Sequence, residues 1–155
     1  MNMTLWIDAD AAPRDAKDIA FRAALRLRFP LVLVSNRPLA LPPRNPFVSS
    51  VVVAGGPDEA DKHIAQAAVT GDVAVTADIP LASVLVGKGV TTLDPRGREY
   101  SPDSIGERLS VRDFMDGLRG MGVVTPGPRP YGPRDVAAFA AALDRILARL
   151  PVSGR

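Results

Sequence analysis

The sequence predicts one α/β domain built on an open, mainly parallel sheet that is flanked by helices. Residues 5–7 (LWI) and 73–75 (VAV) are short apolar runs of the kind found in parallel strands, which are buried on both faces. Segments with helical spacing of apolar residues lie between such runs. Because strands that alternate with helices are typical of parallel sheets, the order of these segments indicates the fold class.

The N-terminal part of the chain predicts two strands joined by a helix. The strands are expected at residues 3–9 and 31–34, and the helix at 13–28, since Pro13 suits the start of a helix. The helix residues expected to face the core are Ile19, Ala20, Ala23 and Leu27. Residues 37–46 (RPLALPPRNP) hold too many prolines for a helix and predict a rigid loop.

The middle of the chain continues the alternation. Strands are expected at residues 51–53, 73–76 and 90–93, and helices at 58–68 and 80–86. Acidic residues at the start of the first of these helices suit the positive end of the helix dipole.

Beyond residue 93 the pattern becomes helical. A helix is expected at residues 105–121, and a Pro/Gly linker at 125–133 leads to a closing amphipathic helix at 136–150. In the first of these helices, the residues at core spacing are Val111, Phe114, Met115 and Leu118. The apolar stripe of the closing helix is Val136, Phe139, Leu143, Ile146, Leu147 and Leu150.

The length of the chain fits a single domain. The 155 residues are enough for one compact core. We expect one domain over residues 1–155, with an alternating β/α core at 1–93 and two C-terminal helical segments, 94–124 and 133–150, that are joined by the linker.

The composition is that of an ordinary globular protein. Apolar residues make up 46% of the chain and charged residues 23%. No stretch approaches the roughly 20 apolar residues of a membrane span, and no export signal precedes the first strand. We therefore expect a cytoplasmic protein with no membrane partner.

Charge and residue usage exclude several classes of function. The formal net charge of +2 is too small for a protein that coats nucleic acid through charge alone. The absence of cysteine excludes disulfides, thiolate ligands and a cysteine nucleophile. With His63 as the only histidine, a multi-histidine zinc site is excluded as well.

Four aspartates are placed to meet at the carboxyl ends of the predicted strands, where parallel sheets bind ligands. Asp8 and Asp78 end two of the strands, Asp10 begins the turn after the first strand, and Asp61 lies in the helix at 58–68. Gathered carboxylates repel one another unless a cation or protons neutralise them. Oxygen-only ligands favour Mg²⁺ or Mn²⁺, which can hold a phosphate oxygen and activate a water molecule.

Helix capping is the structural alternative for these aspartates. Aspartate is a frequent N-cap residue, worth about 1 kcal/mol. Asp10 and Asp78 both precede helix-opening prolines by two or three residues, so capping alone explains their positions.

Five further residues are candidates for substrate binding. Asn36 follows the second strand and Thr76 stands two residues before Asp78, although a turn residue and a strand residue are the alternatives. Basic side chains on and before the helix at 105–121 could follow a phosphate backbone. These are Arg96, Arg108 and Arg112. The alternative is a solvated helix face on which Arg112 and Asp116 form an i,i+4 ion pair.

Seven segments of the chain resemble the YaiI/YqxD family of small bacterial proteins, which belongs to the PIN-like nuclease superfamily. They are WIDADAAP, LVSNRPL, DEADKHI, GDVAVTADIPLA, LDPRGREY, RDFMDGLR and GPRPYGPRDVAAFAAALDRIL, and they span almost the whole chain in order. One departure is visible: Ala12 replaces the cysteine of the usual DADACP motif, which removes any thiol role.

The resemblance implies a three-layer α/β/α fold and a metal-dependent nuclease. In PIN-like nucleases an acidic cluster at the end of the sheet binds Mg²⁺ or Mn²⁺ and hydrolyses phosphodiesters, commonly in RNA. The resemblance carries this role to the matching residues Asp8, Asp10, Asp61 and Asp78, with Asp94 as a candidate later member.

Two other functions remain open at this point. One is a catalytically silent RNA- or protein-binding module with the same fold. The other is a haloacid-dehalogenase-like phosphatase, because an apolar strand that ends in D-x-D is the nucleophile motif of that superfamily. That motif continues with Thr or Val four residues after the first aspartate, where this chain has Ala12.

Overall fold

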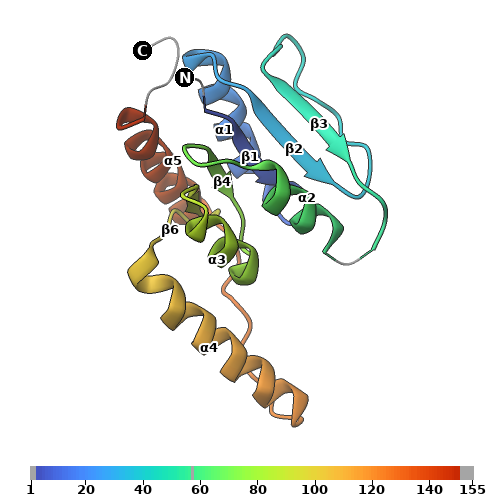
Figure 1. Cartoon of the computed structure of the whole chain (residues 1–155), viewed down its shortest axis with the longest axis vertical. Helices are drawn as coiled ribbons and strands as arrows, with labels where there is room; N and C mark the ends of the chain where they lie inside the picture. Colours follow the sequence, from blue (N-terminus) through green and yellow to red (C-terminus); the bar gives the residue numbers. More distant parts are fainter. Residues whose placement is uncertain (1–2, 57, 151–155) are drawn as a thin grey trace.

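The computed structural model describes residues 3–56 and 58–150, which form a six-stranded sheet with the strand order β3-β2-β1-β4-β5-β6 (Figure 1). All neighbouring strands are parallel except β5 and β6, which are antiparallel. The strands are β1 (Leu5–Asp8), β2 (Leu31–Ser35), β3 (Val48–Val52), β4 (Val73–Val75), β5 (Thr91–Leu93) and β6 (Glu99–Tyr100). The predicted α/β fold with a mainly parallel sheet is confirmed.

Helices cover both faces of this sheet. They are α1 (Arg14–Leu27), α2 (Glu59–Ala67), α3 (Ile79–Gly87), α4 (Pro102–Gly120) and α5 (Pro133–Ala148). Helices α1 and α5 share one apolar core with the sheet, and α2 and α3 share the other. None of the helices in residues 3–56 and 58–150 is long and apolar enough to cross a membrane.

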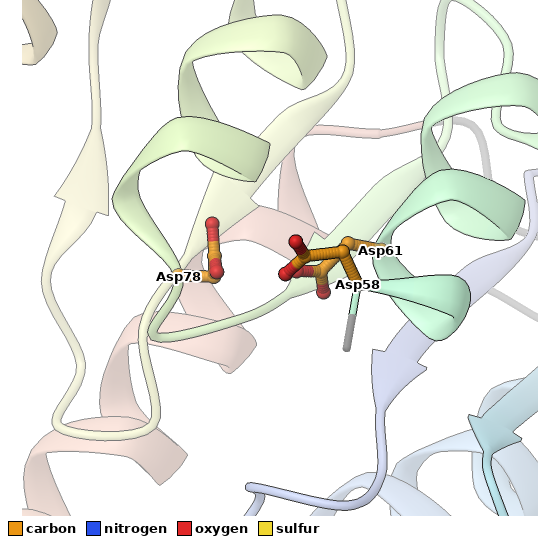
Figure 2. Close-up of side chains that lie close together, drawn as sticks. All are labelled: Asp58, Asp61 and Asp78. Carbon is orange, nitrogen blue, oxygen red and sulfur yellow. The ribbon is translucent and has the colours of Figure 1, made fainter. Parts of the chain in front are cut away.

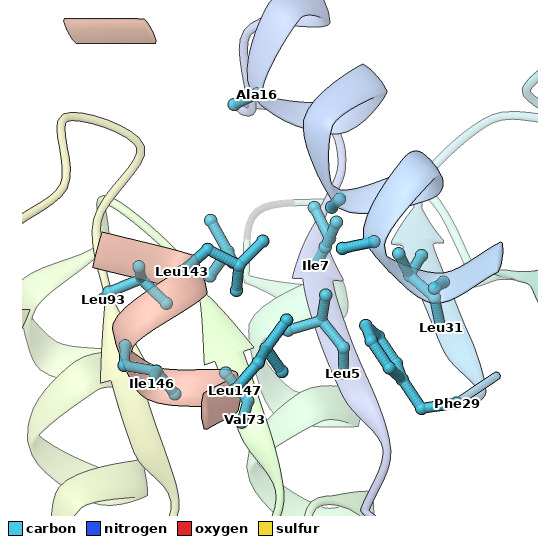
Figure 3. Packing of buried hydrophobic residues seen from close by; sticks show 14 of the residues in the cluster. Leu5, Ile7, Ala16, Phe29, Leu31, Val73, Leu93, Leu143, Ile146 and Leu147 are labelled. Atoms are coloured by element: carbon cyan, nitrogen blue, oxygen red, sulfur yellow. The ribbon is translucent and has the colours of Figure 1, made fainter. Parts of the chain in front are cut away.

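The larger core lies between the sheet and the helices α1 and α5 (Figure 3). Alternate strand residues such as Leu5 and Ile7 point into it because successive side chains of a strand face opposite sides. Helix α5 contributes its predicted stripe, of which Phe139, Leu143 and Ile146 are fully buried. The smaller core under α2 and α3 receives the intervening strand residues, including Val34 and Ala74.

Three local expectations are wrong. Strand β3 begins at Val48 rather than at residue 51, and the hairpin strand β6 interrupts the segment that was expected to be helical. Helix α4 has no buried residue: Val111 is 55% exposed and Phe114 is 65% exposed. The cause is visible in Figure 1, where α4 packs beside α3 and then runs away from the sheet, so its apolar spacing has no core to meet.

A tight loop connects β5 to β6 and is held by its first residue. One carboxylate oxygen of Asp94 accepts the backbone N–H groups of Arg96 at 2.9 Å and Arg98 at 3.0 Å. Gly97, between them, has a φ of +88°, and a Cβ there would lie 2.5 Å from the Ala138 carbonyl oxygen in α5. Glycine is therefore required at this position, both for the backbone angle and for the close approach to α5.

We expect Gly97→Ala to lower the free energy of unfolding by about 2 kcal/mol or more, because it adds left-handed strain to a clash with α5. Gly106→Ala is the matched control. Gly106 lies in α4 with nothing near its Cβ position, and alanine favours a helix by up to about 1 kcal/mol. Urea denaturation measures both changes, and equal stabilities of the two variants would contradict this account.

Candidate metal centre

The site begins where β1 and β4 end side by side. Ile7 pairs with Val75, so Asp8 and Thr76 follow at neighbouring positions at the carboxyl end of the sheet. The Thr76 hydroxyl lies 3.4 Å from the Asp8 carboxylate and also accepts the backbone N–H of Asp78 at 3.0 Å. Thr76 is buried and links the two aspartates that follow the strand ends. It therefore lies at the site, close to Asp78, where the sequence placed it.

Three carboxylates from two helix starts converge in front of this strand end. Figure 2 shows Asp58 and Asp61, at the start of α2, extending toward Asp78 at the start of α3. One oxygen from each of the three lies within 4.8 Å of the others. Such a spacing allows one cation to contact all three carboxylates.

Two further aspartates complete the group, which we call the acidic cluster: Asp8, Asp10, Asp58, Asp61 and Asp78. Asp8 is 9% exposed and its carboxylate interacts with that of Asp61. Asp10 is exposed and accepts the backbone N–H of Asn36 at 2.9 Å. A hollow of about 210 Å³ is lined by Asp8, Asp10, Asn36, Asp58 and Asp61, among others, and a second of about 300 Å³ lies beside Asp58, Asp61 and Asp78.

The described lysines and arginines do not pair with these carboxylates. In residues 3–56 and 58–150, no lysine or arginine forms an ion pair with the acidic cluster. The nearby cations are engaged elsewhere: Lys62 pairs with Glu59, and Arg112 pairs with Asp113 and Asp116.

The uncompensated charge shifts the acidity of the cluster. Burial and the negative charges of Asp78 and Asp8 raise the pKa of Asp61 to about 7. Burial, followed by the charges of Asp10 and Asp78, also raises the pKa of Asp8. Without a cation, the cluster therefore holds a proton close to neutral pH.

Asp72 shows what a purely structural buried aspartate looks like in this protein. It is 5% exposed and lies at the opposite end of the sheet, before β4. Its two oxygens accept the backbone N–H groups of Thr4 and Val69 and the indole N–H of Trp6, each at 3.0 Å. Asp8 has comparable burial, but among the described residues its side chain contacts the Thr76 hydroxyl at 3.4 Å and otherwise interacts with other carboxylates.

Capping accounts for part of the group. One oxygen of Asp78 accepts the Leu81 N–H at 2.8 Å and caps α3, as the structural alternative predicted. Asp10 does not cap α1, whose N-cap is Pro13, and the Asp58 side chain makes no capping hydrogen bond to α2. Capping thus engages one oxygen of Asp78 and leaves the Asp58 carboxylate facing Asp61 and Asp78, and the Asp78 carboxylate also interacts with that of Asp61.

The donor set fits a hard divalent cation. All of its side-chain ligands are carboxylate oxygens, which suit Mg²⁺ and Mn²⁺ and give no preference for softer metals. Asp8, Asp58, Asp61 and Asp78 are the residues that could hold such an ion, with Asp10 at the open side of the hollow.

The predicted basic residues divide between two surfaces. Arg112 lines the hollow beside Asp58, Asp61 and Asp78 and also forms the expected ion pair with Asp116. Arg96 and Arg108 instead line a separate pocket with Asp94. Asp94 is buried, accepts the two loop N–H groups and lies 3.4 Å from Arg108, so it contributes to that pocket rather than to the acidic cluster.

Asp58 is the one member of the cluster that the sequence did not single out. It lies one helical turn before Asp61, and that i,i+3 spacing at the start of a helix places two carboxylates on one face. Its backbone lies in the left-handed region, with a φ of +68°. The spacing was visible in the sequence, whereas the turn that brings Asp58 toward Asp78 was not.

Comparison with known proteins gives the family. A family model described as "Uncharacterized BCR, YaiI/YqxD family" matches residues 6–149. The chain belongs to the YaiI/YqxD family. Among its relatives, the "UPF0178 protein" of Trichlorobacter lovleyi is 52% identical over 148 residues, 96% of each chain. That of Myxococcus xanthus is 53% identical over 148 residues, again 96% of each chain, and that of Geobacter sulfurreducens is 53% identical over 149 residues, 96% of this chain and 98% of the relative.

The raised pKa of Asp61 gives a prediction for the metal-free protein. Between the ordinary value of 3.8 and about 7, the folded state binds this proton more tightly than the unfolded state does. The free energy of unfolding therefore falls as pH rises through this window. Asp61→Asn removes the repulsion, so its melting temperature should exceed that of the wild type by about 2 °C or more at pH 8 and by less at pH 5.

Thermal melts in EDTA at the two pH values measure this effect. Asp18→Asn is the matched control, since Asp18 lies on α1 outside the acidic cluster. A melting temperature of Asp61→Asn at or below that of the control at pH 8 would show that the cluster carries no such strain.

Proposed function

We propose that this protein is a divalent-metal-dependent hydrolase that cleaves phosphodiester bonds in RNA. The observation that carries the proposal is the acidic cluster of five neighbouring aspartates, which form no ion pair with a lysine or arginine in residues 3–56 and 58–150. Its place at the carboxyl end of a parallel sheet, where this class of fold binds ligands, supports the proposal. The PIN-like resemblance of the same residues supplies the substrate class.

Four side chains of the acidic cluster would hold the metal ion, and a fifth residue orients two of them. Asp8 lies deepest, and Asp58, Asp61 and Asp78 approach from the starts of α2 and α3. When bound, Mg²⁺ or Mn²⁺ would supply charge stabilisation for a phosphodiester and a more acidic water molecule. Thr76 holds Asp8 and the Asp78 backbone in their relative positions through its hydroxyl.

Asp10 is placed to accept a proton. It is exposed at the mouth of the smaller hollow, and only one of its oxygens accepts the Asn36 N–H. In hydrolysis, a water oxygen bonds to phosphorus, the bond to the leaving oxygen breaks, and a water proton passes to a base. The second oxygen of Asp10 can take that proton, while Asn36 and Arg112 border the space that the phosphate would occupy.

Cleavage of a labelled single-stranded RNA in the presence of Mn²⁺ tests the proposal. We expect activity that EDTA abolishes, and a loss of about 100-fold or more in kcat for Asp8→Asn, Asp61→Asn and Asp78→Asn. Asparagine keeps the α3 cap at Asp78, so a loss there reports on charge rather than on folding. Asp18→Asn should cleave at the wild-type rate.

Two results would overturn the proposal. One is an intact RNA after incubation with wild-type protein and Mn²⁺, which would favour the silent binding module. The other is equal cleavage by the three asparagine variants and the wild type, which would place the activity outside the acidic cluster.

A further inference from the structure

A pocket of about 540 Å³ lies next to the acidic cluster and carries the opposite charge. Four arginines line it, and we call it the arginine pocket: Arg96, Arg98, Arg108 and Arg129. Asp94 is also in its wall, and Asp135 lies behind Arg96 and Arg129. Four guanidinium groups therefore face two carboxylates, which leaves a net positive charge.

The arginine pocket adjoins the metal centre. Ala11 lines both the arginine pocket and the smaller acidic hollow, and it directly follows Asp10. Ala77 also lines the arginine pocket and directly precedes Asp78. The turns that follow β1 and β4 thus carry carboxylates on one side and border the arginines on the other.

The fold holds these arginines in place before any ligand arrives. Arg129 forms two hydrogen bonds to Asp135, at 2.7 and 2.8 Å, and Arg96 lies 3.2 Å from the same carboxylate. The hydrogen bonds from Arg129 and from the Gly132 N–H lower the pKa of Asp135 to about 2, so this anchor stays charged. Arg108 stacks over the Tyr100 ring at 4.2 Å.

Arg98 is the arginine with the most freedom to bind a ligand. Its backbone is fixed by hydrogen bonds to Asp94 in both directions. Its side chain is exposed and forms no ion pair within residues 3–56 and 58–150. A guanidinium offers five N–H donors in a planar fork that matches phosphate oxygens.

We propose that the arginine pocket binds a phosphate group of the substrate strand, beside the phosphodiester that lies at the acidic cluster. This inference rests on the proposed function for the identity of the strand, but phosphate binding itself requires neither metal nor cleavage. Arg98 and Arg108 contact the phosphate, while Asp94 and Asp135 position the arginines. Tyr131 and Pro95 form the apolar wall beside them.

Nucleotide titrations in EDTA test the pocket separately from catalysis. The probe is adenosine 5′-monophosphate, added to ¹⁵N-labelled protein while the backbone amide signals of residues 96–98 are followed by NMR. We expect saturable shifts of these signals with the nucleotide and none with adenosine. Arg98→Ala should weaken nucleotide binding about tenfold. Arg145→Ala is the matched control and should bind as the wild type does, because Arg145 is exposed in the last turn of α5, outside the arginine pocket.

Two further ligands distinguish the kinds of phosphate. Adenosine 3′-monophosphate carries a terminal phosphate of the other polarity, and the dinucleotide ApA carries only an internal phosphodiester. Preference for either monophosphate assigns the pocket to a strand end, and equal binding of ApA assigns it to the strand interior. Both results support the proposal, because both place a phosphate among the arginines.

The proposal fails if the nucleotide leaves the signals of residues 96–98 unchanged, if adenosine shifts them equally, or if Arg98→Ala binds as tightly as Arg145→Ala. RNA cleavage decides the proposed function independently. If wild type cleaves RNA and Arg98→Ala raises KM about tenfold at unchanged kcat, both proposals stand. Nucleotide binding without RNA cleavage would support phosphate binding in the arginine pocket and contradict the proposed nuclease activity.

Discussion

Repulsion among carboxylates at one end of the sheet is the constraint on which this site depends. The parallel pairing of β1 with β4 puts Asp8 beside Thr76, and the next turn brings Asp78 to the same place. Helices α2 and α3 start here, and the positive ends of their dipoles favour anions. The helix dipoles do not offset the burial and mutual repulsion of the carboxylates, because the pKa of Asp61 still rises to about 7. This remaining repulsion is the reason that we propose a bound cation at the cluster.

The same strand ends separate two regions of opposite charge. On one side the acidic cluster forms no ion pair with any lysine or arginine that the structure describes, and on the other the arginine pocket has more guanidinium groups than carboxylates. Hydrogen bonds hold the residues of each region in place. In the acidic cluster, Thr76 links Asp8 to Asp78, and in the arginine pocket, Asp94 fixes the loop that carries Arg98. The proposed substrate, a phosphate chain with a cation, would complement both regions, because its oxygens could contact the cation and the arginines together.

Much of this arrangement could be predicted from the sequence, for identifiable reasons. The apolar run LWI is followed directly by Asp8, and VAV is followed within three residues by Asp78, so parallel pairing alone places both aspartates at one end of the sheet. The expectation that α4 packs on the core was wrong, because helical periodicity indicates an apolar face but not whether another element covers that face. Phe114, which lies on this face, is exposed. The position of Asp58 depends on a left-handed turn, and the arginine pocket depends on contacts between residues 33 to 39 positions apart, such as those of Arg96 with Arg129 and with Asp135 in α5. Local patterns do not encode such contacts.

Anomalous diffraction from crystals soaked in MnCl₂ near pH 8, recorded at the manganese absorption edge, tests the central claim most directly. The account predicts a peak in contact with the carboxylates of Asp8, Asp61 and Asp78, and its loss in Asp61→Asn crystals soaked in the same way. A map without a peak there, with the carboxylates hydrogen-bonded to one another through shared protons, would contradict it.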